Sequence, residues 1–346
     1  MLKFSCLKHS LQLAFNARTS RGSLKTHDAY FIKVSNLANP KLIGWGEASP
    51  LKGLSVDGVE NFEEIVRHTL DDLNQGKSIS QLDLIKYPAL QFGLEMALLD
   101  LKNGGKRELF RTSFIKSEPI EINGLIWMSD IETMLNEVEN KISEGYTCLK
   151  FKIGALDFDK ECRMLENVRK KHALLDIEIR LDANGSFKND EALGQIKELG
   201  KFNIHSIEQP ISPGQAEYFQ EICAKSSIKI ALDEELIGVD VMKEGKKLLQ
   251  LIKPAFIIIK PTLLGGFIKA DKWIELAGNY QIGWWATSAL ESNIGLNAIA
   301  QWCSTKNNKL PQGLGTGALY TNNIKSPLVA KQGRLIYTDS NQWELP

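Results

Sequence analysis

Short apolar runs that end in polar residues recur every 25–30 residues or so from about residue 120 onward, and a helical pattern follows each one. One strand plus one helix makes a βα unit, and eight such units are what a closed (β/α)8 barrel requires. The sequence therefore predicts a barrel, although an open doubly wound sheet would also explain the alternation. The eighth run is the weakest, because it is rich in glycine and hardly apolar. The runs are Ile122–Trp127, Cys148–Lys152, Ile177–Asp182, Ile204–Glu208, Lys229–Asp233, Phe256–Lys260, Ile282–Ala286 and Gln312–Gly315.

The first hundred residues have a different pattern, which predicts an α+β lobe. Residues 1 to about 50 resemble strands and turns, and residues 58–76 and 88–103 resemble helices. The last residues are too few for another βα unit, so we expect them to return to the first lobe. The expected architecture is α/β, with an α+β domain over 1–105, a (β/α)8-type barrel over 106–318 and a returning tail over 319–346.

Composition excludes several classes of partner. The 346 residues carry a formal net charge of +0, and no basic patch interleaved with aromatics predicts nucleic-acid binding. No apolar stretch reaches the roughly 18 residues of a membrane span. The five cysteines are scattered and form no CxxC pair, and the first residues do not resemble a signal peptide, so we expect a cytoplasmic protein. A homo-oligomer remains open.

Three successive predicted strands end in a carboxylate. Asp182, Glu208 and Asp233 would lie on the catalytic rim of a barrel, where neighbouring strands are about 4.8 Å apart. Three hard oxygen ligands with room for water suit Mg²⁺ better than zinc. Each residue alone could equally be a helix N-cap, but three at matching strand ends predict a metal site.

Lysines end two of the predicted strands. Lys150 and Lys152 are two apart and therefore point to the same face, where adjacent ammonium groups lower each other's affinity for a proton. That effect would make a lysine usable as a base. Lys260 ends an apolar strand on the opposite side of the rim. Taken alone, each could be an ordinary solvated rim lysine.

Small residues end the last two runs. Ser288 could bind a substrate carboxylate near a helix start, and Gly315 could let a ligand approach the backbone. Both could equally belong to ordinary turns. The five histidines form no HxxxH or HxH pair, so a histidine metal site is disfavoured.

The ordered set of motifs resembles the muconate-lactonising branch of the enolase superfamily over nearly the whole chain. The matching segments are Lys150–Lys152, Asp182–Asn184, Glu208–Pro210, Ala231–Glu234, Ile257–Pro261, Thr19–Gly22 and Gly44–Ala48. The resemblance implies Mg²⁺, for which Mn²⁺ can substitute, and a small-molecule carboxylate substrate. It implies metal binding by the three carboxylates, acid/base roles for Lys152 and Lys260, tuning of Lys152 by Lys150, and a supporting layer of Asn184 and Glu234. Loops around Ser20, Arg21 and Leu54 would cap and select the substrate.

Within this branch the nearest resemblance is to the dehydratases of menaquinone biosynthesis, which convert a hydroxy-cyclohexadiene carboxylate to an aromatic product. N-acylamino-acid racemases, dipeptide epimerases and muconate cycloisomerases share the machinery and stay open as alternatives. Dipeptide epimerases carry an Asp-x-Asp pair where this chain has Gly315-Thr316-Gly317, which counts against that activity. A metal-binding relative without catalysis is disfavoured, because both lysines and all three carboxylates are present.

Overall fold

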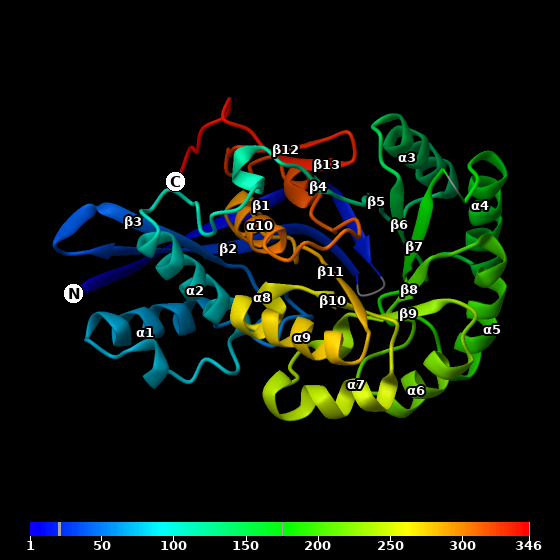
Figure 1. Ribbon diagram of the computed structural model, residues 1–346, viewed down its shortest axis with the longest axis horizontal. Helices are drawn as coiled ribbons and strands as arrows, with labels where there is room; N and C mark the ends of the chain where they lie inside the picture. Colours follow the sequence, from blue (N-terminus) through cyan, green and yellow to red (C-terminus); the bar gives the residue numbers. More distant parts are fainter. Residues whose placement is uncertain (20–21, 175, 346) are drawn as a thin grey trace.

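The computed structural model describes residues 1–19, 22–174 and 176–345, and it divides into an N-terminal lobe and a barrel (Figure 1). Three antiparallel strands build the sheet of the lobe, in the order β1 (Leu2–Thr19), β2 (Gly22–Asn36) and β3 (Asn39–Ala48). The helices α1 (Phe62–Asn74) and α2 (Pro88–Lys102) pack against this sheet and bury its apolar face. The predicted strands and both predicted helices are therefore present.

The helix α2 approaches β3 so closely that glycines are required at the contact. A Cβ atom added at Gly46 would lie 1.9 Å from the carbonyl oxygen of Gly93, far inside van der Waals contact. Glycine at both positions therefore brings the backbone of α2 directly against the sheet. This contact positions the loop that follows β3. Residues of that loop, Leu51 and Leu54, border the pocket described below.

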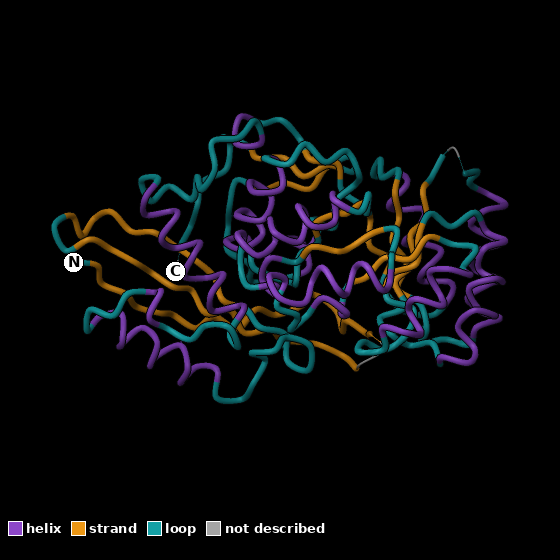
Figure 2. The backbone as a smooth tube through the Cα atoms, turned by 60° about the horizontal axis from the view of Figure 1, so that its bottom comes forward, coloured by secondary structure: helices purple, strands orange, loops and turns teal. Residues whose placement is uncertain are grey.

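Seven parallel strands form the barrel sheet, and their spatial order follows the chain without interruption. Helices pack around the outside of these strands, as Figure 2 shows. The strands are β5 (Gly124–Ile126), β6 (Cys148–Lys152), β7 (Glu178–Asp182), β8 (Ser206–Glu208), β9 (Lys229–Leu232), β10 (Phe256–Ile259) and β11 (Gly283–Ala286). The helices are α3 (Ile131–Ser143), α4 (Phe158–Lys171), α5 (Asn189–Leu199), α6 (Ala216–Lys225), α7 (Lys246–Ile252), α8 (Pro261–Leu264), α9 (Phe267–Asn279) and α10 (Asn293–Ser304).

The eighth run closes the ring through isolated bridges and forms no continuous strand. Gln312 bridges Ile122 beside β5, and Gly313 bridges Thr287 at the end of β11, both in parallel orientation. The backbone bonds Gln312 N to Glu121 O (2.8 Å) and Gly313 N to Ala286 O (2.7 Å) complete the closure. The glycine-rich composition explains the brevity, because glycine contributes no side chain to a sheet. The expected barrel architecture is present, with its last strand reduced.

The tail contacts both parts of the molecule. Leu13 of β1 forms an antiparallel bridge with Tyr320. After it, β12 (Leu328–Lys331) pairs with β13 (Arg334–Tyr337), and β13 pairs with the short strand β4 (Ile120–Glu121). Short helical turns complete the architecture at Ile79–Gln81, Phe114–Lys116, Gly200–Phe202, Glu234–Leu236, Val241–Gly245 and Thr316–Leu319. Among the residues described, no helix is long and apolar enough to span a membrane.

Candidate active site

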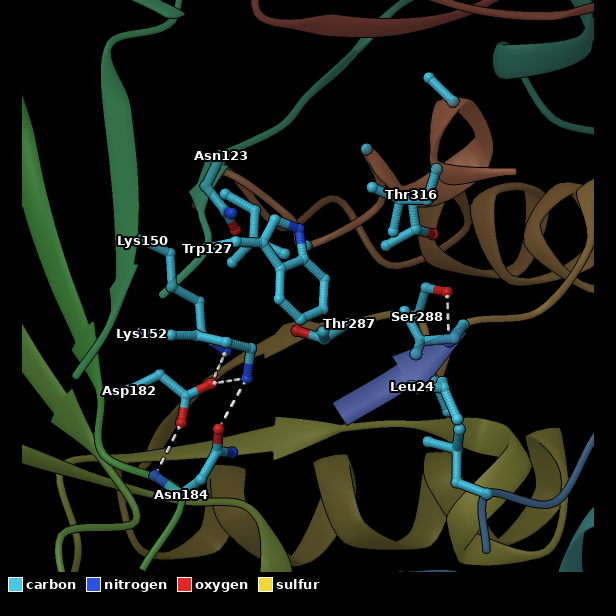
Figure 3. Close-up of a pocket in the computed structure, with 18 of the residues that line it drawn as sticks. Leu24, Asn123, Trp127, Lys150, Lys152, Asp182, Asn184, Thr287, Ser288 and Thr316 are labelled. Carbon is cyan, nitrogen blue, oxygen red and sulfur yellow. Dashed lines mark hydrogen bonds and ion pairs between the residues drawn. The ribbon is translucent and has the colours of Figure 1, made fainter. Parts of the chain in front are cut away.

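A pocket of about 460 Å³ lies at the carboxyl ends of the barrel strands, where Phe15 of β1 and Ser23 and Leu24 of β2 also line it. Figure 3 shows its polar side, with Lys150, Lys152, Asp182 and Asn184 facing Trp127 and Thr287. Apolar side chains of the N-terminal lobe complete the wall, namely Phe15, Leu24, Leu51 and Leu54. A mixed apolar and charged pocket of this kind suits a small organic acid.

The strand register aligns the acidic residues on one rim. Lys152, Asp182 and Glu208 are direct Cα partners on β6, β7 and β8, so their side chains leave neighbouring strands at one level. Glu208 is paired with Ala231 of β9, which places Asp233 two residues further toward the same end. All three carboxylates are at most 2% exposed. Because these strands are parallel and end at nearly the same level, their ends bring three buried acids together.

Lys150 neutralises two of these acids in the structure. Its Nζ lies 2.7 Å from both oxygens of Glu208 and 2.9 Å from Oδ2 of Asp182. Burial disfavours the ammonium form, but the two carboxylates outweigh it and raise the pKa of Lys150. The sequence predicted that Lys150 and Lys152 lower each other's affinity for a proton. At Lys150 the acidic neighbours have the opposite effect and raise the pKa.

Lys152, 12% exposed against 5% for Lys150, has a different set of partners. Its Nζ donates to Oδ1 of Asn184 at 2.7 Å and to Oδ2 of Asp182 at 3.1 Å. Asn184 adopts a left-handed backbone with φ of 46°, which asparagine tolerates better than most residues. In this conformation its backbone N–H donates to Asp182 and its side-chain amide donates to Glu234. Asn184 thus connects the lysine with two acids.

Lys260 approaches the acids from the other side of the rim. Its ammonium group contacts Asp233, at the point where β10 ends and α8 begins. Burial lowers the proton affinity of Lys260, but Asp233 and Glu208 together raise the pKa above its usual value. Lys152 at the end of β6 and Lys260 directly after β10 thus contact two different acids of the rim, Asp182 and Asp233.

Gln209 is a positioning residue that the sequence reasoning did not identify. It is fully buried, has a φ of 42°, and its Oε1 accepts from the backbone N–H groups of Asp233 (3.1 Å) and Glu235 (3.2 Å). The amide thereby fixes the chain that carries Asp233 relative to Glu208. A buried glutamine directly after a strand-end acid is the signal that could have revealed it.

The chemistry of the acidic cluster fits a hard divalent cation. Burial and the charges of Asp182 and Asp233 raise the pKa of Glu208 to about 8, so the cluster requires positive charge beside it. Its ligands are all carboxylate oxygens, which Mg²⁺ prefers. Within the described ranges, no three acidic, histidine or cysteine side chains are already gathered around one point, because ammonium groups bridge the acids. These residue types suit Mg²⁺. In this structure the distances between the carboxylates are set by the lysine ammonium groups that bridge them.

The predicted substrate-binding residues divide into two groups. Leu54, Ser288 and Gly315 line the pocket, whereas Ser20 and Arg21 lie outside the described residues. The sequence reasoning missed several other lining residues. Trp127 follows the end of β5 and could have been found by the strand-end logic, while Phe15, next to a register shift in β1, gives no sequence signal.

Comparisons with known proteins identify the family of the chain. Residues 133–340 match the family described as enolase C-terminal domain-like, and residues 4–101 match the N-terminal domain of MenC. An o-succinylbenzoate synthase from Desulfotalea psychrophila is 43% identical over 92% of this chain and 94% of its own length. The crystal structure of MenC from the same organism has a TM-score of 0.83 and 39% identity, covering 96% of this chain and 99% of that one. An N-succinylamino acid racemase from an Amycolatopsis species is 26% identical over 92% of this chain and 87% of its own length.

Proposed function

Because this chain belongs to the enolase C-terminal domain-like family, we propose that it catalyses the o-succinylbenzoate synthase reaction of menaquinone biosynthesis. The observation that carries this proposal is the 43% identity with the Desulfotalea psychrophila synthase over nearly the whole of both chains. The pocket supports the same chemistry, because two lysines flank three acids beside a cavity of substrate size. We further propose residues 106–318 as the catalytic barrel and 1–105 with 319–346 as its cap.

In this proposal Asp182, Glu208 and Asp233 hold Mg²⁺. When bound, the metal would supply positive charge beside the substrate carboxylate as negative charge develops there. The hydroxy-cyclohexadiene carboxylate would lie between Lys152 and Lys260, with its apolar ring edge against Leu24 and Leu54.

Lys152 performs the proton transfers of the proposed dehydration. Its neutral amine takes the proton from the carbon next to the carboxylate, and the resulting ammonium returns that proton to the departing hydroxyl group. One C–H bond and one C–O bond break, a ring double bond forms, and water leaves. The Lys260 ammonium stays protonated and stabilises the negative charge on the far face. Asn184 orients Lys152 through the 2.7 Å hydrogen bond.

Racemisation of an N-succinylamino acid is the second candidate, favoured by lysines on both faces and by the likeness to the Amycolatopsis racemase. That reaction needs both lysines to exchange protons, whereas a syn elimination needs one. A dipeptide epimerase is disfavoured, because Gly315-Thr316-Gly317 offers no acid for a substrate ammonium group. A relative without catalysis is disfavoured by the retained lysines and acids.

Turnover in heavy water tests the proposal. The diene precursor should be dehydrated rapidly, while N-succinylamino acids should exchange their α-proton slowly or not at all. A Lys152→Ala variant serves as the control for background aromatisation of the precursor. Rapid α-exchange of both N-succinylamino acid enantiomers without dehydration of the precursor would replace the synthase by the racemase.

A further inference from the structure

Glu47 of the N-terminal lobe caps a helix of the barrel. It lies on β3, is fully buried, and accepts hydrogen bonds from the backbone N–H of Ser292 (2.7 Å), the hydroxyl of Ser292 (2.5 Å) and the backbone N–H of Gly295 (2.8 Å). These donors form the N-terminal end of α10. A carboxylate at a helix N-terminus satisfies backbone groups that the helix itself leaves unpaired.

A second buried acid lies directly before this cap and holds the turn that leads to it. Glu291 is fully buried and accepts from the hydroxyl of Ser288 (2.5 Å), the backbone N–H of Ala289 (2.8 Å) and the hydroxyl of Thr262. Ser288, Ala289 and Leu290 all line the pocket. The chain from 288 to 292 thus joins the pocket wall to the acid that crosses from the other lobe.

Leu290 within this turn has a strained backbone. Its φ is 66°, in the left-handed region where a branched side chain is unfavourable. The hydroxyl of Tyr320 donates to its carbonyl oxygen at 2.6 Å, and the backbone N–H of Leu290 donates to the Ser288 hydroxyl at 3.0 Å. Strain persists only where surrounding groups enforce it, and it is concentrated at functional sites.

We propose that Glu47 is a positioning residue for the reaction proposed above. By holding Ser292 it fixes the turn 288–291 and keeps the strained Leu290 against the apolar part of the substrate. The N-terminal lobe then shapes the pocket in two ways. Its loops border the pocket directly, and Glu47 shapes it indirectly by holding the barrel turn 288–291. The identity of the substrate rests on the proposed function. The hydrogen bonds by which Glu47 holds Ser292 and Gly295, called the Glu47 clamp below, do not depend on it.

Glu95 provides a matched control. It lies on α2 of the same lobe and crosses the same boundary to accept from the backbone N–H groups of Phe267 (2.7 Å) and Ile268 (3.3 Å), at the start of α9. Neither Glu95 nor those two residues line the pocket. Glu95→Ala therefore removes an equivalent cap between lobe and barrel without touching the pocket wall.

The first measurement compares the kinetics of the two variants with the diene precursor. Glu47→Ala should raise KM about tenfold or more while kcat changes less than about threefold, because the wall is misplaced and the lysines are not. Glu95→Ala should lower Tm without changing KM. Glu47→Gln, which keeps an acceptor oxygen, should recover most of the loss. Equal effects of Glu47→Ala and Glu95→Ala on KM would overturn the proposal.

Two further measurements isolate the path through Leu290 and remove the dependence on substrate. If Glu47 acts through Leu290, the losses in kcat/KM of Glu47→Ala and Leu290→Ala will be less than multiplicative in the double variant. Amide hydrogen exchange over residues 287–295 should accelerate in Glu47→Ala and stay unchanged in Glu95→Ala. Multiplicative losses, or unchanged exchange in Glu47→Ala, would contradict the clamp. A wild-type enzyme that does not convert the precursor would refute the proposed function alone, because hydrogen exchange still tests the clamp.

Discussion

The ammonium nitrogen of Lys150 lies 2.7 Å from each carboxylate oxygen of Glu208, and both side chains are at most 5% exposed. The two residues are separated by β7, whose Asp182 also contacts the same nitrogen. Burying a charge is costly unless an opposite charge and hydrogen bonds compensate for it. Lys150 therefore neutralises the buried acids of the rim, in addition to lying beside the proposed base Lys152.

Replacement of Lys150 should destabilise the protein when no divalent cation is present. Lys150→Met leaves buried Glu208 without its ammonium partner and Asp182 with Lys152 alone, and breaking a buried ion pair on one side costs about 3–5 kcal/mol. Denaturant unfolding in the presence of EDTA measures this loss. Addition of Mg²⁺ should recover a large part of it if the acids hold the metal. Lys188→Met, which removes an exposed ion pair with Glu191, is the control and should cost less than about 1 kcal/mol.

Lys152→Ala should abolish turnover and preserve the fold. A positioned base contributes about 10²–10⁴-fold to a proton transfer, and the side chain lies at the pocket and outside the apolar core. Steady-state kinetics measure the loss, and an unchanged circular dichroism spectrum excludes unfolding. A variant that kept more than about a tenth of the wild-type rate, a barrier change below roughly 1.4 kcal/mol, would show that another group is the base.

Chelation should remove activity, and Mg²⁺ or Mn²⁺ should restore it. The three buried carboxylates repel one another, so a bound cation should also stabilise the folded state by mass action. Thermal unfolding should therefore show a higher Tm with Mg²⁺ for the wild type. Asp233→Ala should lose that increase, whereas Asp190→Ala, on the exposed start of α5, should retain it. Full activity of the metal-free enzyme would reject the metal site.

Stability should decrease as pH rises from about 4.5 to 7, in part because of Glu47. Burial and then the neighbouring Glu291 raise the pKa of Glu47 from 4.5 to about 7, against the hydrogen bonds from Ser292. The folded state therefore binds more protons than the unfolded state in this window, and deprotonation costs stability. Glu47→Gln has no such proton to lose, so its stability relative to wild type should improve by about 1–3 kcal/mol between pH 5 and pH 8. Urea unfolding at several pH values measures this, and the exposed Glu60→Gln should follow the wild type.

Much of the rim could be predicted from the sequence alone, because it depends on local order. In a parallel sheet the carboxyl ends of successive strands meet at one edge, so the acids that end β7 and β8 and the acid after β9 are expected to lie together once the strands are recognised. The same reasoning predicted that Lys152 and Lys260 face each other across the rim. Spacing along the chain also predicted eight units, although the eighth forms only isolated bridges, since glycine gives weak strand signals.

Only the tertiary structure decided which groups complete the site. The partners of Lys150 depend on how far its side chain reaches across β6, β7 and β8. Spacing alone therefore predicted a lowered pKa for Lys150, whereas the acids on the neighbouring strands raise it. Phe15 reaches the pocket because of the path of a long hairpin, which no local pattern encodes. Glu47 and Ser292 are 245 residues apart, and they meet only where the N-terminal lobe docks on the barrel. Local chemistry thus determined the reactive groups, and long-range packing determined how they are held.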